Sequence, residues 1–489
     1  MNNSGKIKLN FVFKLIYQVV AILVPLVTTP YLARVLGAHE LGNYGYAYSI
    51  MVYFGLAAVF GFNIYGRREI AKVRDDKKKT STVFFELMIA KSIPAVISIL
   101  LFVVLALFYK EYSILLLSLI PFLVYHLFDI TFLVQGDENF KFITFRDLAV
   151  KAATIVLIFV LIKKPEDVWI YALIISITQL LSGLCMLPYL RKRIVKVPLK
   201  KLKIFIHLRK TLMFLVPAFA SAVFLYADKI MIRLITGMPE QVAFYEESIK
   251  IITMLTGITT SLVNVIEPRN ANEIANKNID QAKSNVVKGL NYSMVVCLPM
   301  LAGLICVAPI FCPIFFGEGF DDVIPILQIM CILIPLITIN EMLGTAYLIP
   351  SGREKIFTNI ILICALINIA LNFLFVYFFG ALGAAISTAI SELCKMVIIV
   401  WIVRKEFNFM EILKNSSKKI ISTVLMLTFV LPMSIISVGS VISFVAIILS
   451  GIVIFFASEF VLQDKEFMVM ANYCLKPIFK LFKIKKKDE

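Results

Sequence analysis

The chain has 489 residues, of which 60% are apolar and only 17% are charged, and its mean hydropathy is +0.90. Soluble globular proteins are about 45–50% apolar, so the composition excludes a disordered chain and an ordinary soluble enzyme. It predicts an all-α, polytopic membrane protein. The net charge of +17 would suggest nucleic acid in a soluble protein, but basic residues kept on cytoplasmic loops explain it here, and we expect no nucleic-acid partner.

Fourteen segments are apolar enough and long enough to cross a bilayer as helices. They are predicted at about 10–36, 42–66, 81–108, 112–135, 146–163, 167–190, 211–236, 242–268, 286–312, 322–350, 356–379, 382–403, 420–438 and 441–463. Because their number is even, both termini lie on the same side. Eight scattered cysteines without a CxxC pair and three histidines do not form a metal-ligand pattern, so we expect no metal.

Lys and Arg residues are distributed unevenly between the two alternating sets of loops. Alternate loops, beginning with the N-terminus, hold 38 of the 49 Lys and Arg residues, the opposite set holds three, and eight lie within spans. An excess of Lys and Arg marks cytoplasmic loops, which places both termini in the cytoplasm. The most basic loop, 191–210, is predicted to be a helix that lies on the anionic leaflet.

The sequence repeats weakly at an offset of about 200 residues. Gly37–Tyr44 aligns with Gly237–Phe244, Glu69–Ala71 with Glu273–Ala275, and Gly136–Glu138 with Gly352–Glu354. Three matches in the same order predict two six-helix bundles of the same orientation, followed by two extra helices. The expected domains are an N-terminal bundle (1–190), a basic cytoplasmic linker (191–210), a C-terminal bundle (211–405), and two additional helices with a basic tail (406–489).

Five segments together resemble a known family. They are Thr29–Ala38 with Gly42 and Tyr44, the basic run Tyr65–Asp75, the pattern Phe132–Lys141, Asp228–Ile232, and Ile266–Arg269. The chain is therefore identified as a member of the polysaccharide-biosynthesis (O-antigen and teichoic-acid type) flippases. These belong to the multidrug/oligosaccharidyl-lipid/polysaccharide exporter superfamily. Arg233 departs from the family pattern, which usually has a small residue after the Met-Ile pair.

The resemblance implies a transporter of the bacterial plasma membrane and not an enzyme. It would flip an isoprenoid-pyrophosphate-linked oligosaccharide, or a teichoic-acid precursor for the cell wall, to the outer leaflet by alternating access. Its partners would be this lipid-linked glycan, membrane lipids and polysaccharide-assembly enzymes. The alternatives are a drug or cation antiporter of the same superfamily, and a polytopic glycosyltransferase or glycan polymerase.

Four basic residues within spans are candidates for binding the anionic substrate: Arg34, Lys91, Lys229 and Arg233. A charge inside a membrane needs a partner or a wet cavity, and the arginine fork suits phosphate. Arg34 and Arg233 occupy nearly equivalent places in the repeat. The competing interpretations are that both arginines reach the headgroups and that Lys91 pairs with Asp129.

Six further residues are candidates for coupling or gating: Asp129, Asp228, Glu341, Pro25, Pro30 and Pro217. The carboxylates could bind a coupling ion, either H⁺ or Na⁺, or form salt bridges. The prolines could bend their helices as gates or give static kinks. The chain has no GxxxxGK[ST] phosphate loop, so we expect no ATP and no cofactor.

Overall fold

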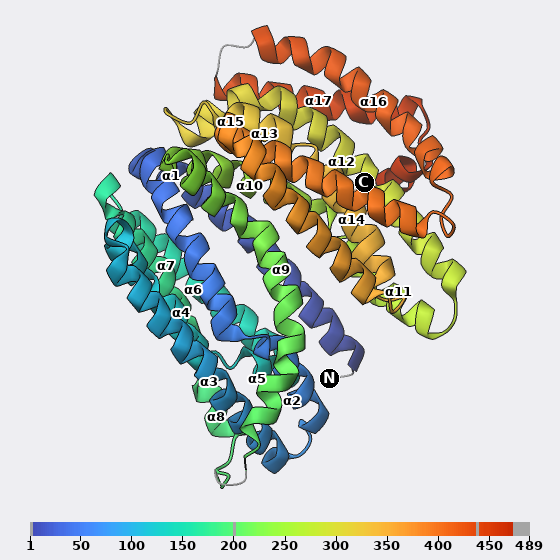
Figure 1. Ribbon diagram of the computed structural model, residues 1–489. Coiled ribbons are helices and arrows are strands. Elements are labelled where there is room, and N and C mark those ends of the chain that lie inside the picture. The colour runs from blue at the N-terminus through green and yellow to red at the C-terminus, as the bar shows by residue number, and fades with distance from the viewer. Residues whose placement is uncertain (1–2, 199–201, 437–439, 473–489) are drawn as a thin grey trace, which may run out of the picture. The chain divides into compact units, whose positions relative to one another are not determined.

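The computed structural model describes residues 3–198, 202–436 and 440–472, and every regular element in them is a helix (Figure 1). The chain forms two compact units, Met1–Glu246 and Glu247–Glu489. The predicted domain boundary around 191–210 and the repeat-related bundles remain predictions.

The first unit is built on long apolar helices: α1 packs against α3, α4, α6 and α9, and α4 packs against α7. Its elements are α1 (Asn3–Val59), α2 (Phe62–Val73), α3 (Lys77–Phe108), η1 (Lys110–Tyr112), α4 (Ser113–Phe128), α5 (Thr131–Gly136), α6 (Phe140–Leu161), η2 (Pro165–Asp167), α7 (Val168–Leu184), α8 (Pro188–Arg193), α9 (Ile204–Thr236) and the start of α10 (Pro239–Thr259).

In the second unit α12 packs against α14, α16 and α17, and α16 packs against α17. Its elements after α10 are α11 (Val263–Ala275), α12 (Ile279–Phe316), α13 (Val323–Met330), α14 (Leu333–Leu343), the π-helical turn η4 (Gly344–Leu348), α15 (Glu354–Val403), α16 (Phe409–Ile436) and α17 (Val441–Val461).

The predicted multi-pass membrane architecture is confirmed. Among the described residues, nine helices are long and apolar enough to span a bilayer, or ten if α10 and α11, bent by 45°, form one span. Helices α1 and α15 each break at a glycine, Gly37 (φ 74°) and Gly380 (φ 57°), and each covers two predicted spans. Glycine adopts positive φ without strain. The helices are compatible with fourteen spans, and that number remains a prediction.

Two local expectations were wrong. The segment 191–210 does not form one helix, because α8 ends at Arg193, residues 194–198 are not helical, and α9 begins at Ile204. Pro198 disfavours helix at the residue before it, and the neighbouring β-branched residues add little helix propensity. The span 112–135 also breaks at Asp129, whose backbone is extended (ψ 108°) and whose carboxylate accepts a hydrogen bond from the backbone N–H of Thr131 at 2.9 Å.

The loops of the first unit gather into two groups, as alternating membrane topology requires. In the basic group, Arg193 binds Asp137 (2.7 Å) and Arg74 binds Glu138 (2.5 Å). In the other group, Arg233 binds Glu111 at 2.7 Å. We call the end formed by residues 37–43, 109–115, 163–169 and 233–240 the outer end of this unit. Which end faces the cytoplasm remains a prediction from the charge distribution.

Candidate functional site

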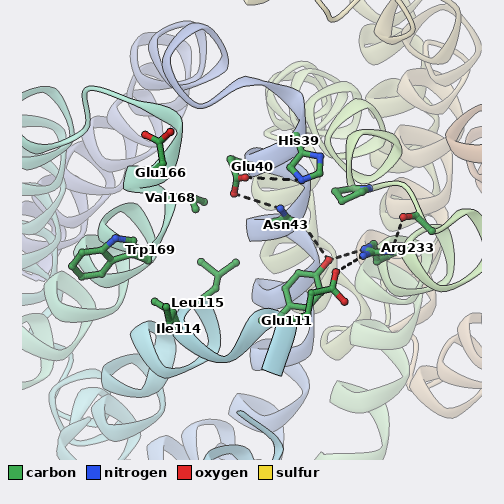
Figure 2. A pocket seen from close by; sticks show the side chains of 13 residues that line it. His39, Glu40, Asn43, Glu111, Ile114, Leu115, Glu166, Val168, Trp169 and Arg233 are labelled. Carbon is green, nitrogen blue, oxygen red and sulfur yellow. Dashed lines mark hydrogen bonds and ion pairs between the residues drawn. The ribbon is translucent and has the colours of Figure 1, made fainter. Parts of the chain in front are cut away.

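A cavity of about 470 Å³ opens at the outer end of the first unit. Acidic, amide and aromatic side chains line it together with Arg233 (Figure 2). The lining residues include Glu40, Asn43, Glu111, Tyr112, Glu166 and Trp169. Trp169 is 42% exposed. Carboxylates and amides bind hydroxyl groups, and an exposed aromatic ring offers an apolar face, so the lining could hold a polar, hydroxyl-rich group.

Arg233 holds the wall of this cavity together. Its Nη2 donates to Glu111 Oε1 (2.7 Å), its Nε to the Tyr112 hydroxyl (2.7 Å), and its Nη1 to the backbone oxygen of Gly237 (2.7 Å). Tyr112 in turn donates to Asn43 Oδ1 at 3.0 Å. The Glu111 side chain is 60% exposed and that of Arg233 is 15% exposed. An ion pair with so exposed a partner contributes little, so another anion could replace Glu111.

The two repeat-related segments Gly37–Tyr44 and Gly237–Phe244 touch each other at this end. His39 Nδ1 lies 2.6 Å from Glu240 Oε1. A Cβ atom at Gly42 would lie 1.7 Å from the backbone oxygen of Pro239. A side chain at position 42 would therefore force the segments apart. The internal repeat relates the two segments in sequence, but it does not predict that they contact each other.

Lys229 and Asp228 each find a partner on α10. Lys229 Nζ lies 3.3 Å from Glu246 Oε1, and the Tyr245 hydroxyl donates to the Asp228 carboxylate. Lys229 and Asp228 are both buried. Lys229 also lies over the ring of Tyr226. Water screens the buried Lys229–Glu246 pair less than it screens the pair of Arg233 with the exposed Glu111,.

Lys91 and Asp129 form an ion pair, as the competing interpretation of Lys91 predicts. Their side chains are each 1% exposed, and Nζ lies 3.5 Å from Oδ2 and 2.9 Å from the backbone oxygen of Asp129. The helix break at Asp129 frees that oxygen to accept from Lys91. The Lys91 ammonium is thus buried against Asp129 in this structure.

The other candidates are spread over the chain. Arg34 has an exposed side chain, and its Nη1 lies 3.4 Å from the backbone oxygen of Pro30. Glu341 is half-buried in α14 and accepts from the Thr345 hydroxyl at 2.6 Å. Pro25 and Pro30 lie within α1, which stays helical through both and breaks at Gly37 instead. The side chain of Pro217, in α9, falls outside the described residues.

Sequence reasoning missed most of the contacts in two buried polar networks. In the first unit, His207 lies between the Tyr65 hydroxyl (2.9 Å from Nδ1) and Glu86 (3.0 Å from Nε2). In the second, Glu392 accepts from Asn340 (2.6 Å) and from Lys395 (2.8 Å). The i,i+3 spacing of Glu392 and Lys395 on one helix does predict that these two residues pair. Nothing in the spacing of the other residues shows that they meet, because their helices are far apart in the sequence.

A bidentate ion pair joins two loops of the second unit. Arg353 Nη1 and Nη2 lie 2.6 and 3.0 Å from the two carboxylate oxygens of Glu406. Burial alone would raise the pKa of Glu406, but the hydrogen bonds and charge of Arg353 outweigh it and lower that pKa. The pair fixes the loop after η4 against the end of α15.

Comparison with known proteins places this architecture. Residues 7–272 match the family described as "Polysaccharide biosynthesis protein". A protein of Escherichia coli (strain K12) named "Putative O-antigen transporter" is 27% identical over 419 residues, 82% of this chain and 98% of its own. A protein of the same name from Shigella dysenteriae is 25% identical, covering 76% and 93%.

Two solved structures share the fold. "Lipid II flippase MurJ, inward closed conformation" aligns with a TM-score of 0.73 at 16% identity, over 96% of this chain and 99% of that one. A multidrug resistance MATE family transporter of the MOP superfamily, in an inward-facing conformation, aligns with a TM-score of 0.60 at 14% identity, over 81% and 100%. With the sequence match over more than half of its length, the chain belongs to the polysaccharide biosynthesis protein family, and its fold is that of the MOP superfamily transporters.

Proposed function

We propose that the protein is a flippase that carries a lipid-linked glycan from the cytoplasmic to the outer leaflet of the bacterial plasma membrane, with both termini in the cytoplasm. The observation that carries this proposal is the family match over residues 7–272. The likeness to O-antigen transporter relatives over nearly their whole length supports it. The substrate would be an isoprenoid-pyrophosphate-linked oligosaccharide or a teichoic-acid precursor.

The charges of the first unit favour an anionic substrate over a drug cation. An isoprenoid pyrophosphate cannot enter a low-dielectric path without compensating positive charge. Lys91 and Lys229 would have to leave buried carboxylates to supply it, whereas the contacts of Arg34 and of Arg233 with Glu111 involve exposed side chains and are weakened by water,. Arg34 and Arg233 are therefore the proposed primary phosphate ligands, and Lys229 and Lys91 are the proposed secondary ones.

The cavity at the outer end would contact the glycan as it leaves. Its carboxylates, the Asn43 amide and the exposed Trp169 ring match the chemistry of sugar hydroxyls and sugar faces,. For the outer end to open, the segments 37–44 and 237–244 must separate, which breaks the contact of His39 with Glu240. Closing and opening of this contact would be one step of alternating access.

Transport would use an H⁺ or Na⁺ gradient, or the substrate gradient alone, without ATP or a bound cofactor. Asp129, Asp228 and Glu341 remain the proposed coupling carboxylates, and the prolines of α1 and α9 the proposed bending points. The MATE likeness shows only a shared fold, and the antiporter function remains the alternative.

Depletion of the protein in its own bacterium tests the proposal. A surface glycan should disappear while its lipid-linked precursor accumulates and stays inaccessible to enzymes added outside the cell. Re-expression of the wild-type chain should reverse both effects, and a well-expressed Arg34→Ala, Arg233→Ala double variant should not. An unchanged set of surface glycans, or a precursor that is chemically altered by the purified protein, would contradict the proposal.

A further inference from the structure

The ends of α16 and α17 that adjoin basic loops enclose a buried lysine between two carboxylates. Lys419 is fully buried, and its Nζ lies 2.9 Å from Asp464 Oδ2 and 3.2 Å from Glu466 Oε2. Asp464 also accepts from the backbone N–H of Phe467 (2.9 Å), and Asn291 of α12 donates to Glu466 (3.3 Å). The ammonium of Lys419 is thus shared by two anions that have further donors of their own.

A third carboxylate, Glu459 of α17, has no such partner. Its side chain is 0% exposed, and within the described ranges neither carboxylate oxygen makes a hydrogen bond. The buried Ser422 hydroxyl of α16 lies near enough to Glu459 to favour its ionised form, but the two groups do not form a hydrogen bond of normal geometry. Glu459 lies about one helical turn after Phe455, which belongs to a buried apolar cluster that also contains Phe467,.

The charges around Glu459 do not neutralise an ionised carboxylate there. The charged groups that act on it are Asp464, Lys419 and Lys418. Asp464 repels it, Lys419 is already shared by two anions, and Lys418 has an exposed side chain whose Nζ donates to the backbone oxygen of Gln463 at 3.2 Å. A single nearby serine hydroxyl does not offset the cost of burying an ionised carboxylate, and a proton removes the charge,.

A metal ion is the other cation that could occupy such a place. In the part of the chain that the structure describes, no three His, Cys, Asp or Glu side chains are arranged to hold one. The carboxylates of Asp464 and Glu466 instead face the Lys419 ammonium. A proton needs only one carboxyl group, so the arrangement selects a proton over a metal ion.

We propose that Glu459 is a proton-binding site: its carboxyl group holds an exchangeable proton while Lys419 is shared by Asp464 and Glu466. On release, the O–H bond of the carboxyl group breaks and the proton goes to water. The new carboxylate then attracts the Lys419 ammonium away from Asp464 and Glu466. Because Lys419 belongs to α16 while Asp464 and Glu466 follow α17, proton occupancy controls how firmly the two extra helices are joined. This site is independent of the flippase proposal.

Infrared spectroscopy of the full-length protein in lipid nanodiscs tests the site directly. The wild type should show the carbonyl stretching band of a neutral carboxylic acid at pH 7, and the difference spectrum against Glu459→Gln should contain that band. Glu411→Gln, a matched control at an exposed carboxylate of α16, should retain it. Raising the pH should remove the band in the wild type. A difference spectrum without a neutral-acid band would overturn the proposal, and so would loss of the band on exchanging K⁺ for Na⁺ at constant pH.

Thermal unfolding gives a second, independent readout. Gln has the shape of a protonated Glu and no charge, so Glu459→Gln should leave Tm at pH 7 within the error of the wild type. Asp464→Asn removes an anion from a buried ion pair and should lower Tm clearly. Were Glu459 ionised and paired with Lys419, both variants would lower Tm, which would contradict the proposal.

Discussion

His39 and Glu240 lie 2.6 Å apart, and they belong to two segments that the sequence relates to each other by an offset of about 200 residues. The contact joins the turn after the first half of α1 to the start of α10. Two related segments that meet at one end of a transporter are well placed to part during opening. The contact also needs Gly42, because the segments approach too closely for any Cβ at that position.

Cross-linking positions 39 and 240 should therefore stop transport. In a variant whose eight native cysteines are replaced, a His39→Cys, Glu240→Cys pair should form a disulfide with mild oxidant. Flipping in vesicles should then fall to background and recover after reduction. Each single-cysteine variant is the control and should be insensitive to oxidant. Undiminished flipping by fully cross-linked protein would show that this contact does not open.

Lys91 should matter more for folding than for substrate binding. Removing one partner of a fully buried ion pair leaves an uncompensated charge and typically costs about 3–5 kcal/mol. We expect Lys91→Ala to lower Tm strongly, and a Lys91→Met, Asp129→Asn double variant to recover most of the loss. Lys110→Ala, at an exposed lysine, should leave Tm unchanged. If Lys91→Ala instead keeps the wild-type Tm and loses only flipping, Lys91 belongs to the substrate site.

Arg233 can be tested apart from its role in the wall of the cavity. The proposal predicts that Arg233→Ala abolishes flipping and that Arg233→Lys, which keeps the charge but loses the fork, is partly active. Glu111→Gln removes the ion pair and leaves the guanidinium available, so it should retain flipping. Equal losses in Arg233→Ala and Glu111→Gln, at equal expression, would show that Arg233 acts only by holding Glu111.

The Arg353–Glu406 pair predicts a pH dependence of stability. The pKa of Glu406 is lower in the folded protein than its ordinary value of 4.5. Its contribution is therefore fully present above pH 4.5 and is lost as the pH falls through the lower, folded value. Because the side chains are 26% and 28% exposed, we expect a small effect. The Tm difference between wild type and Glu406→Gln should be constant from neutral pH downwards and shrink below pH 4.5. A difference that grows on acidification would contradict this assignment.

The sequence was sufficient to predict an all-helical membrane fold. Long apolar segments predict the spans, and the uneven distribution of basic residues over alternate loops predicts their orientation. The sequence also indicated the glycine breaks at positions 37 and 380, where predicted spans end. It could not show the helix break at Asp129, where the freed backbone oxygen accepts from Lys91 of another helix. The Glu111 partner of Arg233 and the His207 partner of Glu86 likewise lie more than 100 residues away, and no local sequence pattern predicts these contacts.

The most direct measurement of the central claim is flipping by the purified protein in vesicles. A fluorescent isoprenoid-pyrophosphate oligosaccharide is placed in both leaflets, and a membrane-impermeant reagent bleaches the outer one. Vesicles with the wild-type protein should lose nearly all fluorescence, whereas empty vesicles and those with Arg34→Ala, Arg233→Ala should lose about half, as expected for two equal leaflets. If vesicles with correctly folded wild-type protein lose only half of their fluorescence, under either a proton or a sodium gradient, this result would contradict the account.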